Sequence, residues 1–426
     1  MRRLAIALCA ALAGAAFAVP AQAQPAYGVQ GFAGPTRAGA VPDFELAQRL
    51  GVHITRIEAS WAALEPNGPG GAPDPAALAA LDSTVAAAAR RRIKVVLFVN
   101  RTPCWASSAP AAVREDCSGP QANRADVWRY SPANPADAVP IHTFLAARYG
   151  AKLAAMEVWN EPDQANELYW AGPDKVAKYV ALVKALYGPL KRVTPRLPVL
   201  AGSFVGTDGR WLAAMYARGV KGYYDALAVH FYALPLYGLT QTRATQRRFG
   251  DRTPMWLTEF GWNSCARPGG PAAEFGHLCV TPAGQAKNLA DTAGGLRKMP
   301  WVKAAIQFNL VDQSNGFRFG LLDANRRAKP VLATATGLLR GARLPTTRPT
   351  VRLTRRGSQI RAQGTASGAD VLSLRVFQGS TLRLRATLRT DPLRHWSILL
   401  PAQLGTRGLR VVVRHSVLHT SATARN

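Results

Sequence analysis

AAMEVW at residues 154–159 and PVLAGSF at residues 198–204 are two short, mainly apolar runs on either side of an Ala- and Leu-rich stretch, Pro173–Leu190. Nearly continuous apolar runs are typical of parallel strands that are covered on both faces, and the stretch between them is long enough for a helix. A strand, a helix and a second strand in this order predict one β-α-β unit of a parallel sheet.

The same unit recurs on both sides of this segment, from residue 27 to about residue 343. The predicted strands are Val29–Phe32, Ile54–Ser60, Ile93–Val99, Ala154–Trp159, Pro198–Phe204, Ala226–Phe231, Met255–Phe260 and Ala304–Asn309. Eight strand–helix units predict an α/β fold, a (β/α)8 TIM barrel, which needs about 250 residues plus insertions. A doubly wound open sheet fits less well, because no Gly-rich phosphate loop follows the first strand.

The composition changes after Leu344, where Pro345–Pro349 has the character of a linker. We therefore expect a barrel over residues 24–344 and a small C-terminal all-β, sandwich-like domain over residues 345–426. The second domain has 14 arginines, no lysine and two acidic residues. Carbohydrate binding, cell-wall attachment and simple packing on the barrel all remain open for it. Its predicted strands alternate with period two: Val351–Leu353, Val371–Phe377, Thr381–Leu388, Trp396–Leu400 and Leu409–Val413.

The N-terminus has the layout of a secretory signal peptide. Arg2 and Arg3 precede the apolar run Leu4–Val19, and Ala21-Gln22-Ala23 offers small residues for cleavage. Residues 1–23 are therefore predicted to be removed near Ala23, and the mature protein to be secreted. The run is shorter than the ~20 apolar residues that span a bilayer, so no transmembrane segment is expected.

Four cysteines lie beyond this segment: Cys104, Cys117, Cys265 and Cys279. An even number in an exported chain indicates disulfides, and three pairings are possible. The pairing with the shortest loops joins Cys104 to Cys117 and Cys265 to Cys279. There is no C-x-x-C motif, and no metal or organic cofactor is predicted.

The formal net charge of +28 favours anionic partners such as an acidic or cell-wall polysaccharide. No basic run is interleaved with aromatic residues, so no specific nucleic-acid partner is expected. We expect a monomer.

Two carboxylates follow predicted strands on what would be one face of the barrel. Glu161 stands in Asn160-Glu161-Pro162 after the fourth strand, and Glu259 in Thr258-Glu259-Phe260-Gly261-Trp262 at the end of the seventh. The carboxyl ends of barrel strands form the active face, so this pair could flank one glycosidic bond.

These two motifs, in this order, resemble the signatures of clan-A retaining glycoside hydrolases, a group that includes families 5, 39 and 53. The resemblance implies that Glu161 is the acid/base, that Glu259 is the nucleophile and that the substrate is a β-linked glycan. Asn160 would bind the 2-hydroxyl of the sugar, and Arg56 would keep the nucleophile ionised. It further implies places near the sugar for His230 and Tyr232.

Aromatic residues and a further carboxylate complete the expectations. Trp105 and Trp262 could stack on sugar rings. Many relatives carry a tryptophan on strand eight, where this chain has Gln307 or Phe308, and we expect Gln307 to contact the substrate. Glu157 would share a strand face with Glu161, and either raises its pKa or pairs with a barrel arginine. A catalytically silent glycan-binding barrel of the cell envelope is the alternative function.

Overall fold

The structure is a computed structural model that describes residues 24–31, 43–69, 72–114, 117, 125–232, 236–265, 279–313, 316–366, 371–390 and 394–426. The predicted signal peptide, residues 1–23, lies outside the described residues. Within them, no helix combines the length and the apolar character needed to cross a membrane.

Eight parallel strands form one sheet in the order β1-β8-β7-β6-β5-β4-β3-β2, as the (β/α)8 prediction requires. The ring closes between β1 and β2, where the Thr55 hydroxyl donates a hydrogen bond of 2.8 Å to the Val29 carbonyl oxygen. A side chain at Gly28 would overlap the backbone of Ile54, so glycine permits this close approach. The strands are β1 Ala26–Gln30, β2 Ile54–Ser60, β3 Lys94–Asn100, β4 Leu153–Val158, β5 Val199–Phe204, β6 Ala226–Tyr232, β7 Met255–Gly261 and β8 Val302–Phe308.

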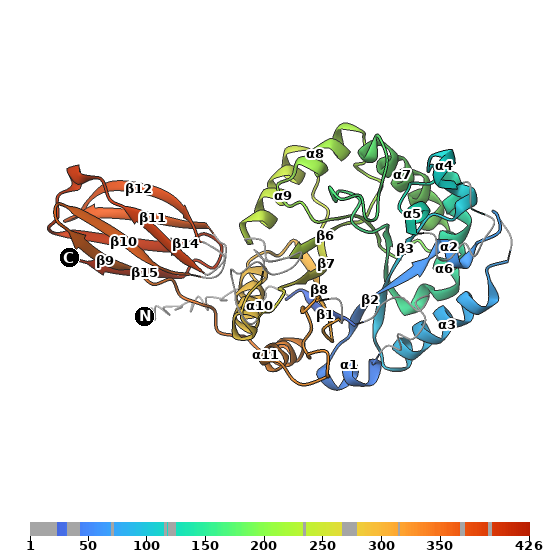
Figure 1. Cartoon of the computed structure of the whole chain (residues 1–426), viewed down its shortest axis with the longest axis horizontal. Coiled ribbons are helices and arrows are strands. Elements are labelled where there is room, and N and C mark those ends of the chain that lie inside the picture. The colour runs from blue at the N-terminus through green and yellow to red at the C-terminus, as the bar shows by residue number, and fades with distance from the viewer. Residues whose placement is uncertain are drawn as a thin grey trace, which may run out of the picture.

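Helices surround the sheet, as Figure 1 shows. Several begin at residues that the sequence marks clearly. Asp74 accepts a hydrogen bond of 2.8 Å from the Ala77 amide ahead of Pro75, and Thr281 caps the helix that begins at Pro282. The helices are α1 Phe44–Leu50, α2 Trp61–Leu64, α3 Pro75–Arg90, α4 Ala111–Arg114, α5 Ala125–Trp128, α6 Val139–Tyr149, α7 Lys175–Val193, α8 Arg210–Ala217, α9 Leu236–Arg248, α10 Pro282–Leu296 and α11 Pro330–Leu339.

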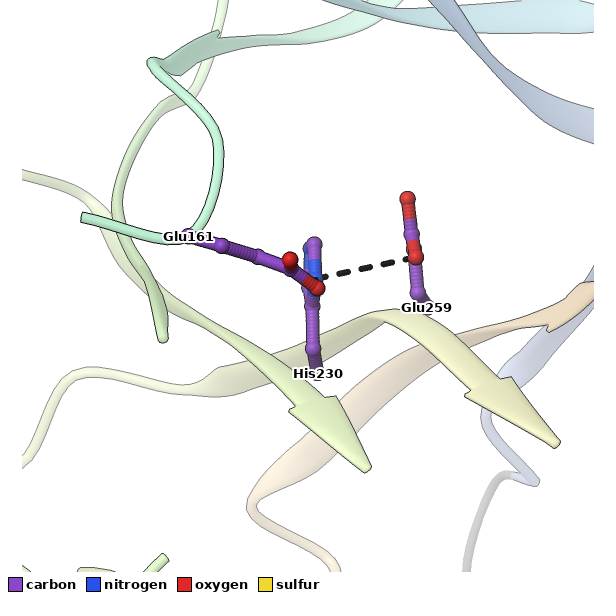
Figure 2. Close-up of side chains that lie close together, drawn as sticks. All are labelled: Glu161, His230 and Glu259. Carbon is purple, nitrogen blue, oxygen red and sulfur yellow. Dashed lines mark hydrogen bonds and ion pairs between the residues drawn. The ribbon is translucent and has the colours of Figure 1, made fainter. Parts of the chain in front are cut away.

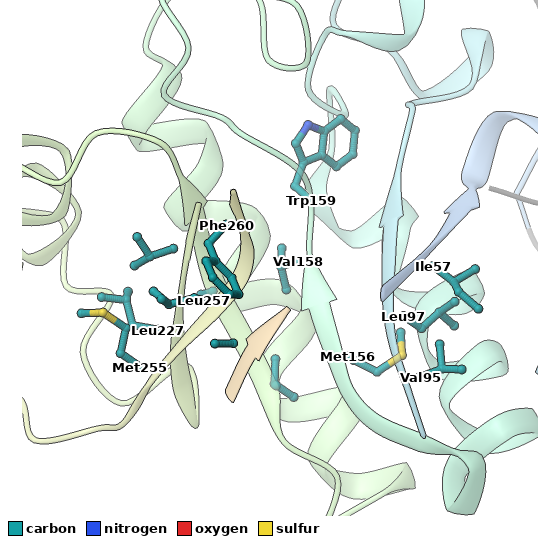
Figure 3. Packing of buried hydrophobic residues seen from close by; sticks show 14 of the residues in the cluster. Ile57, Val95, Leu97, Met156, Val158, Trp159, Leu227, Met255, Leu257 and Phe260 are labelled. Carbon is teal, nitrogen blue, oxygen red and sulfur yellow. The ribbon is translucent and has the colours of Figure 1, made fainter. Parts of the chain in front are cut away.

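The barrel has two apolar regions that differ in place. One lies between the strands and the helices, where side chains such as Leu97, Met156 and Leu257 pack together (Figure 3). The other fills the barrel interior with small and branched residues: Ile54, Val96, Ala155, Leu200, Ala226, Ala228, Ala304 and Ile306. Further along the same inward faces the side chains become polar, beginning with Arg56 and Glu157. The functional site lies in this polar layer, at the carboxyl ends of the strands.

The C-terminal part contains two antiparallel sheets with their own apolar core. Their orders are β13-β10-β9 and β12-β11-β14-β15. Two of these strands have weak sequence signals, because β10 is mostly polar and β15, SATAR, contains no large apolar residue. Trp396 lies in this core and is 3% exposed, so it offers no sugar platform. The strands are β9 Arg352–Arg356, β10 Gln359–Thr365, β11 Val371–Gln378, β12 Thr381–Arg389, β13 His395–Leu399, β14 Leu409–His415 and β15 Ser421–Arg425.

These sheets join the barrel at helix α10. The buried Asp291 carboxylate accepts hydrogen bonds from the Thr347 amide at 2.5 Å and from Arg394 at 2.9 Å. Val417 and Leu418 extend the apolar cluster of the barrel itself. A side chain at Gly294 would overlap Thr346, so the linker lies directly against the helix.

Candidate active site

Arg56 organises the polar layer of the barrel. Its guanidinium group is fully buried and donates to Glu157 at 2.5 Å, to Glu259 at 2.5 Å and to the Asn160 amide oxygen at 2.8 Å. Burial alone would lower the pKa of Arg56, but Glu157 and Glu259 together raise it, so the group stays cationic. One cation from β2 thus binds residues from β4, from β7 and from the turn after β4.

Glu157 has a structural place in this layer. Besides Arg56, its other oxygen accepts hydrogen bonds of 2.7 Å from the hydroxyls of Ser203 and Thr258. These partners surround Glu157, which is fully buried. The sequence left two roles open for Glu157, and both are present: Glu157 pairs with a barrel arginine, and its charge makes a minor contribution, after burial, to the raised pKa of Glu161.

Glu259 faces the barrel interior because β7 is irregular at this point. The register between β7 and β8 shifts between Leu257 and Phe260, and such a bulge re-aims side chains. Thr258 and Glu259 are neighbours in the sequence, yet both side chains contact the polar layer. The Tyr232 hydroxyl donates to the second oxygen of Glu259, and burial raises the pKa of Tyr232 well above its ordinary value. Arg56 and Tyr232 together stabilise a carboxylate at Glu259.

Glu161 lies on a turn and not on a strand, because β4 ends at Val158. The expectation that it shares a strand face with Glu157 is therefore wrong. Trp159 and Glu161 have φ angles of 68° and 42°, a left-handed conformation that non-glycine residues adopt rarely and that is found at functional sites. One oxygen of Glu161 lies 2.7 Å from Nδ1 of His230. In Figure 2 the Glu161 carboxylate points at the His230 ring. The turn thus directs Glu161 across the mouth of the barrel toward β6 and β7.

The surroundings of Glu161 favour its protonated form. Burial, followed by the charge of Asp163, raises its pKa to about 8, although Arg56 acts in the opposite direction. Asp163 is held by hydrogen bonds from the Val205 and Gly206 amides at 3.0 and 2.8 Å. Gln164 donates to the other oxygen of Glu161. Glu161 therefore carries a proton at neutral pH, while Glu259 is held by a cation and a hydroxyl.

Asp163→Asn is expected to lower the pKa of Glu161, because it removes a negative charge that raises it. The alkaline limb of kcat/KM for an aryl glycoside should shift toward lower pH, by about one pH unit for each 1.4 kcal/mol of repulsion removed. Asp208→Asn is the matched control, since Asp208 is an exposed carboxylate on the loop after β5, the loop whose amides hold Asp163. An alkaline limb that stays in place in Asp163→Asn would contradict the assigned role of Asp163.

His230 completes the group and comes from the end of β6. Its Nδ1 lies 3.6 Å from a Glu259 oxygen as well as beside Glu161. Burial lowers the pKa of His230, so the ring is neutral at pH 7. Glu161, His230 and Glu259 could each offer one ligand atom to a metal ion, and these atoms lie within 4.8 Å of one another. The proton on Glu161 and the charge of Arg56 both oppose a cation there.

The two predicted stacking tryptophans mainly contact protein. Trp262 is 5% exposed and packs edge-on against Phe260. Trp105 is half-buried, and its indole N–H donates to the Glu65 carbonyl oxygen at 2.7 Å. Trp262 is thus largely covered by protein and Trp105 only in part, and stacking of either ring on a sugar stays a prediction.

On strand eight, Phe308 and not Gln307 borders the site. Gln307 is 3% exposed, and its amide donates to the neighbouring Phe308 carbonyl oxygen at 2.8 Å. The Phe308 ring is partly exposed and meets Tyr232 edge-on, with 5.9 Å between ring centres. Strand alternation turns neighbouring residues to opposite faces, so Phe308 is the residue of this pair that faces the mouth. Contact of Gln307 with a substrate stays a prediction.

Sequence reasoning missed several polar groups around the mouth. Glu58 lies two residues beyond Arg56 on β2 and pairs with Arg101, which stacks on Trp128 at 4.4 Å. Among the described residues, some buried side-chain atoms at strand ends have no hydrogen-bond partner. A polar residue that ends an apolar strand is the signal that could have found them. Those that the sequence reasoning did not name are Gln30 Oε1, Asn100 Oδ1 and Asn309 Oδ1.

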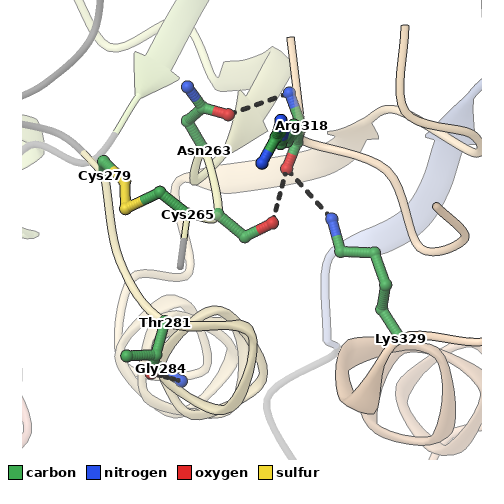
Figure 4. Close-up of a disulfide and its surroundings, with 8 residues drawn as sticks. Asn263, Cys265, Cys279, Thr281, Gly284, Arg318 and Lys329 are labelled. Carbon is green, nitrogen blue, oxygen red and sulfur yellow. Dashed lines mark hydrogen bonds between the residues drawn. A yellow bond between two sulfur atoms is a disulfide. The ribbon is translucent and has the colours of Figure 1, made fainter. Parts of the chain in front are cut away.

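Two disulfides cross-link loops at the same end of the barrel. Cys104 pairs with Cys117 after β3, and Cys265 with Cys279 after β7, which is the short-loop pairing. Beside the second disulfide, the Arg318 backbone donates to Asn263 at 2.8 Å and accepts from Lys329 at 3.0 Å (Figure 4). The loop that follows Glu259 is thus tied to the loop that follows β8.

Two carboxyl groups lie side by side in this barrel mouth, one with a raised pKa at Glu161 and one paired with a cation at Glu259, and these are the groups that cleavage of a glycosidic bond uses. Residues 143–309 match the family described as the glycosyl hydrolase catalytic core. A comparison with curated proteins finds no match. The part of the chain that holds both Glu161 and Glu259 is therefore similar to a glycosyl hydrolase catalytic core.

Solved structures of low sequence identity share this fold. A family 39 glycoside hydrolase from Bacteroides cellulosilyticus WH2 superposes with a TM-score of 0.55 at 15% identity, over 89% of this chain and 80% of that one. A monomeric β-xylosidase from Caulobacter crescentus CB15 gives 0.50 at 14% identity, over 88% and 97%. An exo-β-1,4-mannosidase from Opitutaceae bacterium strain TAV5 gives 0.51 at 17% identity, over 74% and 59%.

Proposed function

We propose that the chain is a secreted, retaining glycoside hydrolase that cleaves a β-linked oligo- or polysaccharide by double displacement. The observation that carries the proposal is the proximity of Glu161 and Glu259, whose facing carboxylate oxygens lie within 4.8 Å. Retaining enzymes place the two carboxyl groups about 5–5.5 Å apart, whereas inverting enzymes need about 6.5–9.5 Å to admit a water molecule. The N-terminal sequence pattern supports secretion.

In the first step, the Glu259 carboxylate attacks the anomeric carbon and Glu161 gives its proton to the departing glycosidic oxygen. The bond from the anomeric carbon to that oxygen breaks, and a glycosyl ester forms on Glu259. In the second step, Glu161 takes a proton from water, the water oxygen attacks the anomeric carbon, and the ester bond breaks. Both glutamates return to their starting states.

The other groups of the mouth suit a polyhydroxylated substrate. The oxygens of Gln30, Asn100 and Asn309 are buried and have no partner in the described part of the chain, so a turn of these side chains toward the mouth would let them accept hydrogen bonds from sugar hydroxyls. Asn160 gives its amide oxygen to Arg56, which leaves its amide N–H groups for a hydroxyl beside the reacting carbon. The similar structures include enzymes that act on β-xylosides and β-mannosides, so these sugars come first in a substrate panel.

The stereochemistry of the first product tests the proposal directly. The wild-type chain is incubated with aryl β-xyloside, β-mannoside, β-glucoside and β-glucuronide, and the active substrate is followed by proton NMR. We expect the β-anomer of the sugar to appear first and the α-anomer to grow in later by mutarotation. An α-anomer formed first would indicate inversion, and glycan binding without turnover would indicate a catalytically silent barrel.

Secretion is tested separately by N-terminal sequencing of the protein from the culture medium. We expect a mature N-terminus at Gln24.

A further inference from the structure

One face of the four-stranded C-terminal sheet carries a concentration of arginines. The strands β12, β11, β14 and β15 lie side by side, and their alternate residues turn toward or away from the domain core. The outward positions include seven arginines, six of them exposed and Arg410 partly exposed. Five of them, which we name the arginine face, are Arg375, Arg385, Arg410, Arg414 and Arg425, and the other two are Arg383 and Arg389 on β12.

The strand register places these arginines close to one another. Arg375 stands opposite Arg385 on the neighbouring strand, and Arg410 stands opposite Arg425. Directly opposed side chains lie about 4.5–5.5 Å apart at Cβ, and like charges in that position destabilise a sheet. No Asp or Glu occurs in these four strands to compensate. The arginines of this sheet therefore repel one another, and a bound anionic partner would reduce this repulsion.

In the described part of the chain, the domain meets the barrel mainly through other residues, and Arg414 is the member of the face that lies near the barrel, where burial, followed by the charge of Arg414, lowers the pKa of Lys298. The domain's contacts with helix α10 come from Arg394, from the linker residue Thr347 and from the turn that carries Val417 and Leu418. These are loops at the ends of strands, and in Figure 1 the sheets extend away from the barrel.

We propose that the arginine face binds an acidic polysaccharide that carries carboxylate groups. A guanidinium group binds a carboxylate through two parallel hydrogen bonds, and the chain uses arginine without any lysine here. Sites for single-stranded nucleic acid add exposed aromatic rings on which bases stack. The outward aromatic residue of this sheet, Phe377, is covered by Arg410 at 4.1 Å. A membrane surface would call for apolar side chains that insert, and the arginine face offers none.

Binding to polygalacturonate tests the proposal with the full chain in the Glu259→Ala background, where the polymer is not cleaved. Affinity should fall steeply with salt, as expected when several cations release counterions. Changing the five arginines to glutamine should weaken binding roughly tenfold or more and flatten this salt dependence. Neutral dextran and a single-stranded oligonucleotide serve as competing probes.

The matched control changes five exposed barrel arginines to glutamine: Arg90, Arg192, Arg196, Arg247 and Arg252. An equal loss in this control would show that net charge alone binds the polymer and would overturn the proposal. Tighter binding of the oligonucleotide, or no binding of polygalacturonate by the unchanged face, would also overturn it.

If the glutamine variant unfolds, Arg→Lys at the same five positions provides a second test. This variant keeps the charge and should bind with intermediate affinity. Binding equal to that of arginine would contradict the bidentate contact. Aryl-glycoside hydrolysis by the otherwise wild-type chain should be unchanged in the arginine variants, so this test is separate from that of the catalytic mechanism.

Discussion

Glu259→Ala is expected to abolish turnover of the best aryl glycoside, with a loss of roughly 10⁵-fold or more in kcat, the scale on which a covalent nucleophile acts. The physical reason is that Arg56 and Tyr232 hold this one carboxylate toward the reacting carbon. Azide should restore part of the activity, because a small anion can enter the space left by the side chain. The restored product should be an α-glycosyl azide, detected by NMR, since azide then attacks once from the nucleophile's side.

Glu161→Ala gives the complementary control. Substrates with a good leaving group need no proton in the first step, so this variant should still form the glycosyl enzyme from an activated aryl glycoside. Azide should then give a β-glycosyl azide, because it attacks the covalent intermediate on Glu259. If azide gives the same anomer with both variants, the roles assigned to the two glutamates are wrong.

Arg56→Met is expected to cost both stability and activity. Removing one partner of a buried ion pair leaves an uncompensated charge, which typically destabilises a protein by about 3–5 kcal/mol. Here Glu157 would keep its contacts with Ser203 and Thr258 but lose its cation, and Glu259 would keep Tyr232 alone. The free energy of unfolding in urea and kcat/KM should therefore both fall sharply.

The double variant Arg56→Met with Glu157→Gln separates these two effects. Neutralising Glu157 removes the unpaired charge, so much of the lost stability should return. Activity should stay low, because Glu259 still lacks the guanidinium group that pairs with it and positions it. Full stability in the single variant would show that Glu157 does not depend on Arg56.

The barrel was predictable because each strand is an apolar run followed by a helical stretch with recognisable ends, such as Asp74-Pro75 and Thr281-Pro282. The first strand lies a few residues earlier than expected, at Ala26–Gln30, because tight packing at Gly28 and not hydrophobicity positions it. In the second domain, β10 and β15 depend on their neighbours for pairing and carry little apolar signal of their own.

The two glutamates were predictable from their place at strand ends, but their geometry was not. The direction of Glu161 depends on left-handed residues in the turn after β4, and that of Glu259 on a bulge in β7. Pro162 follows Glu161 and Gly261 lies two residues after Glu259, but neither residue type reveals which way the glutamate side chain turns. The influence of Asp163 depends on backbone amides of the loop after β5, a contact between distant parts of the chain.

The contact between helix α10 and the C-terminal sheets has a practical consequence for anyone who cuts the chain. Ending a recombinant fragment at Leu344 would uncover the apolar surface beneath Val417 and Leu418 and strip Asp291 of Arg394 and Thr347. Such a fragment would expose an apolar surface on the barrel, together with the Asp291 carboxylate without its partners. The two parts of the chain should therefore be expressed, purified and assayed as one piece.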